Sequence, residues 1–352
     1  MSNRSTVTNH RLGRHAVAGP GAGEPGGAVT RRPGAPRPRG GRRRRGPSAL
    51  TIFLFVLPGL VLFTLLVVIP MLGAAYVSLF RWNGFGGPPT PGDGSFVGLD
   101  NFTRALGDPV FQGDLWRGLI LVVLSVGIQL PASLALALLL HQRFPGRTAF
   151  RLLFFAPYVI SEVIAGVLFA MVLSPRFGFA NEVMEAIGLG ALIPSNGWLG
   201  ERSLVLFVVF GVVSWKYFGF HMIIYLAGRQ NIPREVTEAA MTDGATGWQV
   251  FRHVTLPLMG PTIRVTIFLS IIGVIQLFDM VWVLTGGGPA NASETMAITM
   301  YRQAFDRSEF GYGSAISILM FLIALIFALG YVRFVMRRDL EGAVTTVGGG
   351  QR

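Results

Sequence analysis

The chain contains no cysteine, and charged side chains make up only 14% of its 352 residues. The missing cysteine excludes disulfides, cysteine-ligated zinc, iron–sulfur clusters and thiol nucleophiles. A soluble domain carries about 25% charged residues, whereas 51% of the residues here are hydrophobic. Five scattered histidines argue against a histidine-based metal centre. The composition therefore excludes a typical water-soluble enzyme.

Two sequence patterns of catalytic proteins are also missing. The chain has no GxxxxGK[ST] sequence, with which P-loop proteins hold the phosphates of ATP. It also has no cluster of histidine, aspartate or serine at catalytic spacing. We therefore expect a non-catalytic chain that binds no cofactor of its own and does not hydrolyse ATP.

The positive charge lies in an N-terminal tail rather than in a folded domain. Residues 1–47 hold 11 arginines and a single acid, Glu24, and are rich in glycine and proline. Such a segment cannot bury enough apolar surface to offset its chain entropy, which predicts a disordered cytoplasmic tail. The run Arg42–Arg45 precedes an apolar stretch, as is typical of attraction to anionic lipid. Nucleic-acid binding is disfavoured, because no aromatic residue is interleaved with the arginines.

Six long apolar segments follow the tail. A bilayer core of about 30 Å needs roughly 20 apolar residues of helix, and lipid offers the backbone no other hydrogen-bond partners. We therefore predict an all-α integral membrane protein with one membrane domain, residues 48–340, followed by a flexible tail, residues 341–352. The six predicted spans cover residues 50–78, 115–140, 152–173, 204–227, 262–284 and 312–335.

Arginines in the flanks predict the orientation of these spans, because positive residues gather on the cytoplasmic side of a membrane. With the N-terminus inside, the cytoplasmic segments hold 22 arginines and the external segments seven. We therefore expect a multi-pass protein of the plasma or inner membrane with both termini in the cytoplasm.

The cytoplasmic connection between the fourth and fifth spans, residues 228–261, is predicted to fold. Pro233 can open a helix at its first turn, and Gly244 can end that helix. A second short helix is expected over 248–254, with Leu256 and Pro257 breaking it before the fifth span. The two helices would form an elbow whose small residues let another protein approach closely.

The same loop resembles the permease subunits of binding-protein-dependent ABC importers. The loop motif of that family is EAA, three residues, G, nine residues, I, one residue, LP. This chain matches it at every spacing, with valine at 254 in place of isoleucine. The resemblance implies a coupling helix that sits in a cleft of an ATPase subunit. The residues it assigns to coupling are Glu238, Ala239, Ala240, Asp243, Gly244, Leu256 and Pro257.

Further stretches are similar to the carbohydrate branch of this family, which includes maltose-, lactose- and glycerol-phosphate-type permeases. They include APYVISEVIAG at 156–166, WKYFGFHMIIYLAG at 215–228 and FDMVWVLTGGGPANAS at 278–293. The resemblance implies a type I importer permease with six transmembrane helices, paired with a second permease that is usually a different chain. Two ATPase subunits, which bind ATP and Mg, would dock beneath the pair. An extracytoplasmic solute-binding protein would deliver a sugar.

Three charged side chains lie inside predicted spans, namely Glu162, Lys216 and Asp279. Such groups are costly in lipid and usually face a cavity or a partner. An ion pair between Glu162 and Lys216, the only lysine of the chain, is one interpretation. Contact with solute hydroxyls and recognition of a charged solute are the alternatives. For Asp279 we favour a structural role.

The register of maltose-type permeases implies a sugar cavity lined from spans three, four and five, with Tyr158 and Glu162 on one helix face. Aromatic and hydrogen-bonding groups there suit a polyhydroxylated solute. The cavity residues that the resemblance implies are Tyr158, Glu162, Val213, Lys216, Tyr217, Phe220, Gly273 and Gln276.

An alternative function is an ion-gradient-driven secondary transporter that relays protons or ions through Glu162, Lys216 and Asp279, but it leaves the loop motif unexplained.

Overall fold

The computed structural model describes residues 49–142 and 144–336. The predicted tails, residues 1–47 and 341–352, lie outside the described residues. The chain divides between Pro58 and Gly59 into two compact units. The second unit holds all of the described helices except the start of the first one.

The first predicted span is a continuous helical stretch. α1 (Ala49–Phe63) crosses the boundary between the two units and passes into a π-helical segment, η1 (Thr64–Val68), and then into α2 (Ile69–Val77). No residue of η1 or α2 is buried. A helix that is apolar on every side and unburied is suited to a lipid environment.

The second and fourth predicted spans are continuous as well. The second consists of α4 (Pro109–Leu124), the π-helical η2 (Ser125–Gln129) and α5 (Leu130–His141). It begins six residues earlier than predicted, where the Asp108 carboxylate caps the new helix by accepting from the amide of Val110 at 2.8 Å. The fourth span is α9 (Val205–Gln230).

The sixth predicted span consists of α16 (Phe310–Tyr331) and the π-helical η6 (Val332–Met336). With the first, second and fourth, it makes four helices among the described residues that are long and apolar enough to cross a membrane. Up to six crossings result if each of two bent helix pairs counts as one span.

A π-helical turn precedes a proline at three places. In each case the proline is the second residue after the π-helical turn. The pairs are η1 with Pro70, η2 with Pro131, and η4 (Phe251–Thr255) with Pro257. Proline lacks an amide hydrogen and clashes with the carbonyl four residues before it. A wider π turn relieves that clash and presents side chains differently from a regular helix. The helices therefore run through these prolines, and the prediction that Leu256 and Pro257 break the second loop helix was wrong.

The third and fifth predicted spans are broken, which corrects the continuous helices predicted over 152–173 and 262–284. α6 (Arg147–Val159) and α7 (Glu162–Val172) meet at 98°. In the fifth, α13 (Gly260–Ile275) ends before α14 (Asp279–Thr285) begins. The loop helices before α13 also bend by 64° against it.

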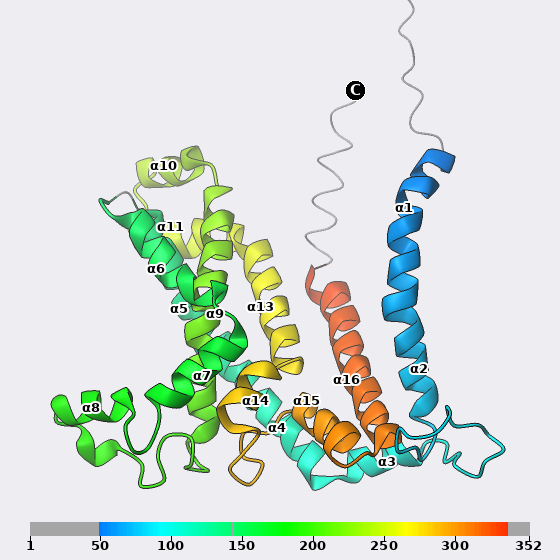
Figure 1. Cartoon of the computed structure of the whole chain (residues 1–352). Coiled ribbons are helices and arrows are strands. Elements are labelled where there is room, and N and C mark those ends of the chain that lie inside the picture. Colours follow the sequence, from blue (N-terminus) through cyan, green and yellow to red (C-terminus); the bar gives the residue numbers. More distant parts are fainter. Residues whose placement is uncertain (1–48, 143, 337–352) are drawn as a thin grey trace, which may run out of the picture. The chain divides into compact units, whose positions relative to one another are not determined.

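Short helices lie at the two ends of the long ones (Figure 1). At one end, the connection between α9 and α13 carries α10 (Arg234–Thr242), α11 (Gly247–Val250) and α12 (Leu256–Leu258). At the other end lie α14 and most of the remaining short helices. The remaining short elements are α3 (Asp100–Gly107), α8 (Phe179–Ala186), η3 (Gly190–Leu192), α15 (Met296–Tyr301) and η5 (Arg302–Asp306).

The helix α9 is the centre of the packing, since α5, α6, α13 and α14 all contact it. Gly219 lets α6 approach α9 closely: an added Cβ would lie 1.9 Å from the carbonyl oxygen of Phe154. A buried apolar cluster joins α9 to α14 through residues such as Val209 and Met280. These contacts bring α7, α9, α13 and α14 around one cavity.

Candidate solute cavity and coupling loop

A cavity of about 270 Å³ lies among α7, α9, α13, α14 and the π-helical segment η2. Six of the eight cavity residues implied by the resemblance line it. Asp279, for which we favoured a structural role, lines it too. The six residues are Glu162, Val213, Tyr217, Phe220, Gly273 and Gln276.

The other two implied residues, Tyr158 and Lys216, lie behind the lining. The ring of Tyr158 stacks on that of Phe220, with centroids 4.7 Å apart and planes 17° apart. Because α6 ends before α7 begins, Tyr158 and Glu162 do not share one helix face, and that prediction was wrong. Tyr158 supports the cavity wall through Phe220.

Lys216 is buried, with 3% of its surface exposed, and is directed at the break between α6 and α7. Its Nζ donates to the carbonyl oxygens of Tyr158, at 3.3 Å, and of Ile160. The last carbonyls of a helix have no partner within it, and a cation at that end is favourable. Lys216 therefore clamps the bend that divides the third predicted span.

The interpreted ion pair between Glu162 and Lys216 is not among the ion pairs that join the described residues. The Glu162 carboxylate instead accepts a hydrogen bond from the hydroxyl of Tyr217, one residue after Lys216. Glu162 is thus held by Tyr217 of α9, whereas Lys216, which itself lies on α9, is held by carbonyl oxygens at the break after α6. This arrangement leaves the Glu162 carboxylate at the cavity and Lys216 away from it.

Four polar lining residues were not predicted, namely Ser125, Gln129, His221 and Ser270. The hydroxyl of Ser125 donates to Oε1 of Gln129 at 2.6 Å and lies 2.7 Å from Oγ of Ser270. Ser125 and Gln129 are the first and last residues of the π-helical turn η2. In the sequence, Ser125 and Gln129 stand out as polar residues within an apolar span. The sequence alone does not show that the helix face which carries them is turned toward the cavity.

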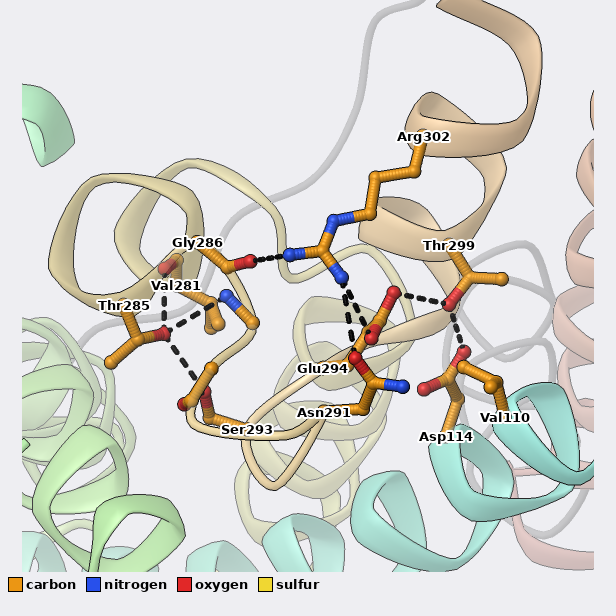
Figure 2. A network of polar contacts seen from close by, with 12 residues as sticks. Val110, Asp114, Val281, Thr285, Gly286, Asn291, Ser293, Glu294, Thr299 and Arg302 are labelled. Atoms are coloured by element: carbon orange, nitrogen blue, oxygen red, sulfur yellow. Dashed lines mark hydrogen bonds and ion pairs between the residues drawn. The ribbon is translucent and has the colours of Figure 1, made fainter. Parts of the chain in front are cut away.

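A polar network fixes the loop after α14 to its neighbours (Figure 2). The buried carboxylate of Glu294 pairs with Arg302 at 2.9 Å and accepts from Thr299 at 3.1 Å. Arg302 also donates to the carbonyl oxygen of Gly286, and Thr299 lies 2.5 Å from the carboxylate of Asp114 on α4. These contacts hold the C-terminal end of α14, the helix that begins with Asp279, against the loop that follows it.

At the other end of α9, the loop helix α10 begins directly after Pro233 and ends before Gly244, as predicted. Gly244 has a φ of +87° and open space around its Cβ position, so it makes the left-handed exit from α10. Glu238, Ala239 and Asp243 are exposed, and Ala240 is partly so. Glu238, Ala239 and Ala240 thus lie on an accessible helix, and Asp243 and Gly244 follow directly at its end.

The loop also exposes apolar side chains next to this helix. Met241 is 55% exposed and Trp248 is 66% exposed. Thr246 and Gln249 form a capping box that starts α11, and therefore fix the position of Trp248 after the turn. Leu256 is partly buried and Pro257 is exposed. An exposed tryptophan beside a small-residue helix is typical of a protein interface.

The chain is similar in sequence or fold to several known transport proteins. Residues 129–339 match the family model described as "binding-protein-dependent transport system inner membrane component". A probable ABC transporter permease of Pyrococcus horikoshii is 33% identical, over 82% of this chain and 97% of its own. The permease of a trehalose/maltose transport system of Thermococcus litoralis is 31% identical, over 80% and 92%. A bacterial ABC transporter that imports the acidic polysaccharide alginate has the same fold, with a TM-score of 0.69 at 24% identity over 81% of this chain and 95% of its own.

Proposed function

Because the chain belongs to the family of binding-protein-dependent transport system inner membrane components, we propose that it is the permease subunit of an ATP-driven sugar importer. The observation that carries this proposal is the exposed elbow formed by α10 and α11, which bears the EAA-x3-G spacing. This elbow gives the chain a surface through which a separate ATPase can act on the spans. The chain itself supplies the path for the solute.

The cavity supports a sugar as the solute. Aromatic rings at Tyr217 and Phe220 offer faces for a sugar ring, and Glu162 and Gln276 offer hydrogen-bonding oxygens. The trehalose/maltose permease that resembles this chain is named for sugars of this kind. We propose that a sugar or oligosaccharide passes through this cavity after an extracytoplasmic solute-binding protein has delivered it.

We propose that Glu238, Ala239, Ala240, Asp243 and Gly244 seat α10 in a cleft of the ATPase, with Leu256 and Pro257 supporting the second arm of the elbow. Trp248 and Met241 would be buried by the same contact, since apolar side chains with more than half of their surface exposed favour a protein partner. Two ATPase subunits would bind ATP and Mg. A second, similar permease would complete the solute path.

For the topology, we propose six crossings, with the bent pairs counted as single spans and both termini in the cytoplasm. The loop helices α10 and α11 would then face the cytoplasm, and α14 and α15 the outside. Movement of the elbow would reach the cavity through α9, which leads into the loop, and α13, which leads out of it. These two helices contact each other.

The proposal is tested by purifying the tagged full chain from its native membrane in mild detergent and identifying the co-purifying proteins by mass spectrometry. We expect a P-loop ATPase and a second membrane-spanning permease. The ATPase should be lost from a Glu238→Arg, Gly244→Val double variant while the second permease is retained. A chain that purifies alone and accumulates solute in ATP-free vesicles under an ion gradient would instead establish the secondary transporter.

A further inference from the structure

The cavity carries negative charge on its lining. Two carboxylates, Glu162 and Asp279, line it, whereas no arginine or lysine is among the described residues that do so. Each carboxylate is the first residue of a helix, and the two helices, α7 and α14, pack against each other. The two groups therefore reach one part of the cavity from adjacent walls.

The nearest cation does not reach the solute space. Lys216 lies on α9 but faces the carbonyl oxygens of Tyr158 and Ile160, and its Nζ is held there at the break between α6 and α7. It lowers the local negative potential without offering a donor to the solute. Asp279 is exposed and has no hydrogen-bond or ion-pair partner in the part of the chain that the structure describes. A net negative charge thus remains in the cavity.

A second observation indicates that this cavity receives a ligand. Gln129 lines it with 4% of its surface exposed. Its carbonyl accepts from Ser125, but its amide nitrogen, Nε2, is buried without a hydrogen-bond partner among the described residues. Leaving such a donor unsatisfied is costly. A solute oxygen, such as that of a hydroxyl or a ring, would satisfy it.

The two kinds of group come from different elements of the cavity wall. The carboxylates begin α7 and α14, while the neutral group of Ser125, Gln129 and Ser270 lies on η2 and α13. The carboxylates and the neutral polar groups therefore belong to different walls of the cavity.

We propose that this cavity selects for solutes without negative charge, namely neutral or amino sugars, and repels acidic ones such as uronates. The proposal rests on the proposed function and adds the charge class of the sugar. An amino group would be attracted by Glu162 and Asp279, and hydroxyl groups of a neutral sugar would bond to both kinds of group. An acidic sugar would have to bring a carboxylate close to two others.

The absence of cysteine from the chain allows a direct test that needs no knowledge of the solute. In the full chain, purified in detergent with its bound subunits, Gly273→Cys places one thiol on the cavity wall. Gly273 is exposed and has open space at its Cβ position. The control is Gly87→Cys, an exposed and open position between α2 and α3, outside both the cavity and the loop between α9 and α13. Each thiol is modified with a cationic trimethylammonium-ethyl or an anionic sulfonatoethyl methanethiosulfonate.

We expect the ratio of cationic to anionic modification rates to be about tenfold higher in Gly273→Cys than in Gly87→Cys, because charge concentrates counter-ions in a cleft. Adding Glu162→Gln and Asp279→Asn should bring the ratio back to the control value. Equal ratios in the two single variants, a preference for the anionic reagent, or no modification of the cavity thiol would each overturn the proposal. The measurement needs no transport, so a negative result would leave the proposed importer function standing. Equally, failure of the co-purification test would not decide the charge of the cavity.

Discussion

The loop between α9 and α13, proposed above to contact the ATPase, and the cavity are built in opposite ways. The loop forms from one continuous stretch of sequence, and it exposes apolar side chains such as Met241 and Trp248. The cavity gathers polar side chains from five separate elements, between Ser125 and Asp279, and holds them inside an apolar bundle. A surface made from neighbouring residues is visible in a motif, whereas a surface made from distant ones depends on how the helices pack.

The largest effect is expected from Gly244→Val in the loop. A φ of +87° is costly for a β-branched residue, by about 1–2 kcal/mol, and the strain would displace the exit from α10. We expect ATP-driven uptake by the intact importer to fall by more than about tenfold, with insertion of the chain unchanged.

A matched control for this prediction is Gly94→Val. Gly94 also has a positive φ, +77°, and open space at its Cβ position, but it lies in the loop before α3. Backbone strain is therefore similar, and only the position differs. Uptake should be almost normal in Gly94→Val. Equal losses in the two variants would show that strain alone, and not the coupling loop, explains the effect.

The second largest effect is expected from Lys216→Met, which concerns the support of the cavity. The change removes the donor for two carbonyl oxygens at the break between α6 and α7. An unsatisfied buried acceptor costs about 1–3 kcal/mol, so the midpoint of thermal unfolding in detergent should fall. Lys216→Arg keeps the charge and should retain part of the stability.

A double variant tests whether Lys216 acts as a clamp on the break between α6 and α7 or as the ion-pair partner of Glu162. If Lys216 and Glu162 neutralised each other, Lys216→Met would restore uptake to a Glu162→Gln variant. The observed partners predict no restoration, because Glu162 is bonded to Tyr217 and Lys216 to carbonyl oxygens. A double variant that transports as well as the wild type would contradict the clamp.

A smaller effect is expected from Gln129→Leu, which removes the unpartnered amide from the cavity. We expect uptake to fall about tenfold, the loss of one hydrogen bond to the solute, with little change in thermal stability. Ser133→Ala is the control: Ser133 is one turn further along the same helical stretch and donates to the carbonyl of Phe218, away from the cavity. Equal uptake in the two variants would remove Gln129 from the solute path.

These residues also show how far the sequence could predict the structure. Pro233 and Gly244 predicted the loop helix correctly, because the start and stop signals of a helix are local. Proline did not predict the break in the third span, since helices run through Pro70 and Pro131 by way of π turns. The break after Pro157 needs a donor from another helix, Lys216. For the same reason, the face of η2 that carries Gln129 could not be assigned before packing was known.

The smallest effect is expected in a turn that belongs to neither region, around Asp93. Hydrogen bonds from the Ser95 hydroxyl and from the amides of Thr90 and Ser95 lower the pKa of Asp93 from its ordinary 3.8 to about 2. A lowered pKa adds stability above the unfolded value, and that stability is lost progressively as the pH falls from about 4 through about 2. Hydrogen exchange of the Thr90 and Ser95 amides should therefore show constant protection between pH 5 and 8. Asp93→Ala should reduce this protection, and sugar uptake should be unaffected. Protection that changes within this pH range would mean that another group holds the turn. A loss of uptake in Asp93→Ala would extend the functional surface beyond the loop and the cavity.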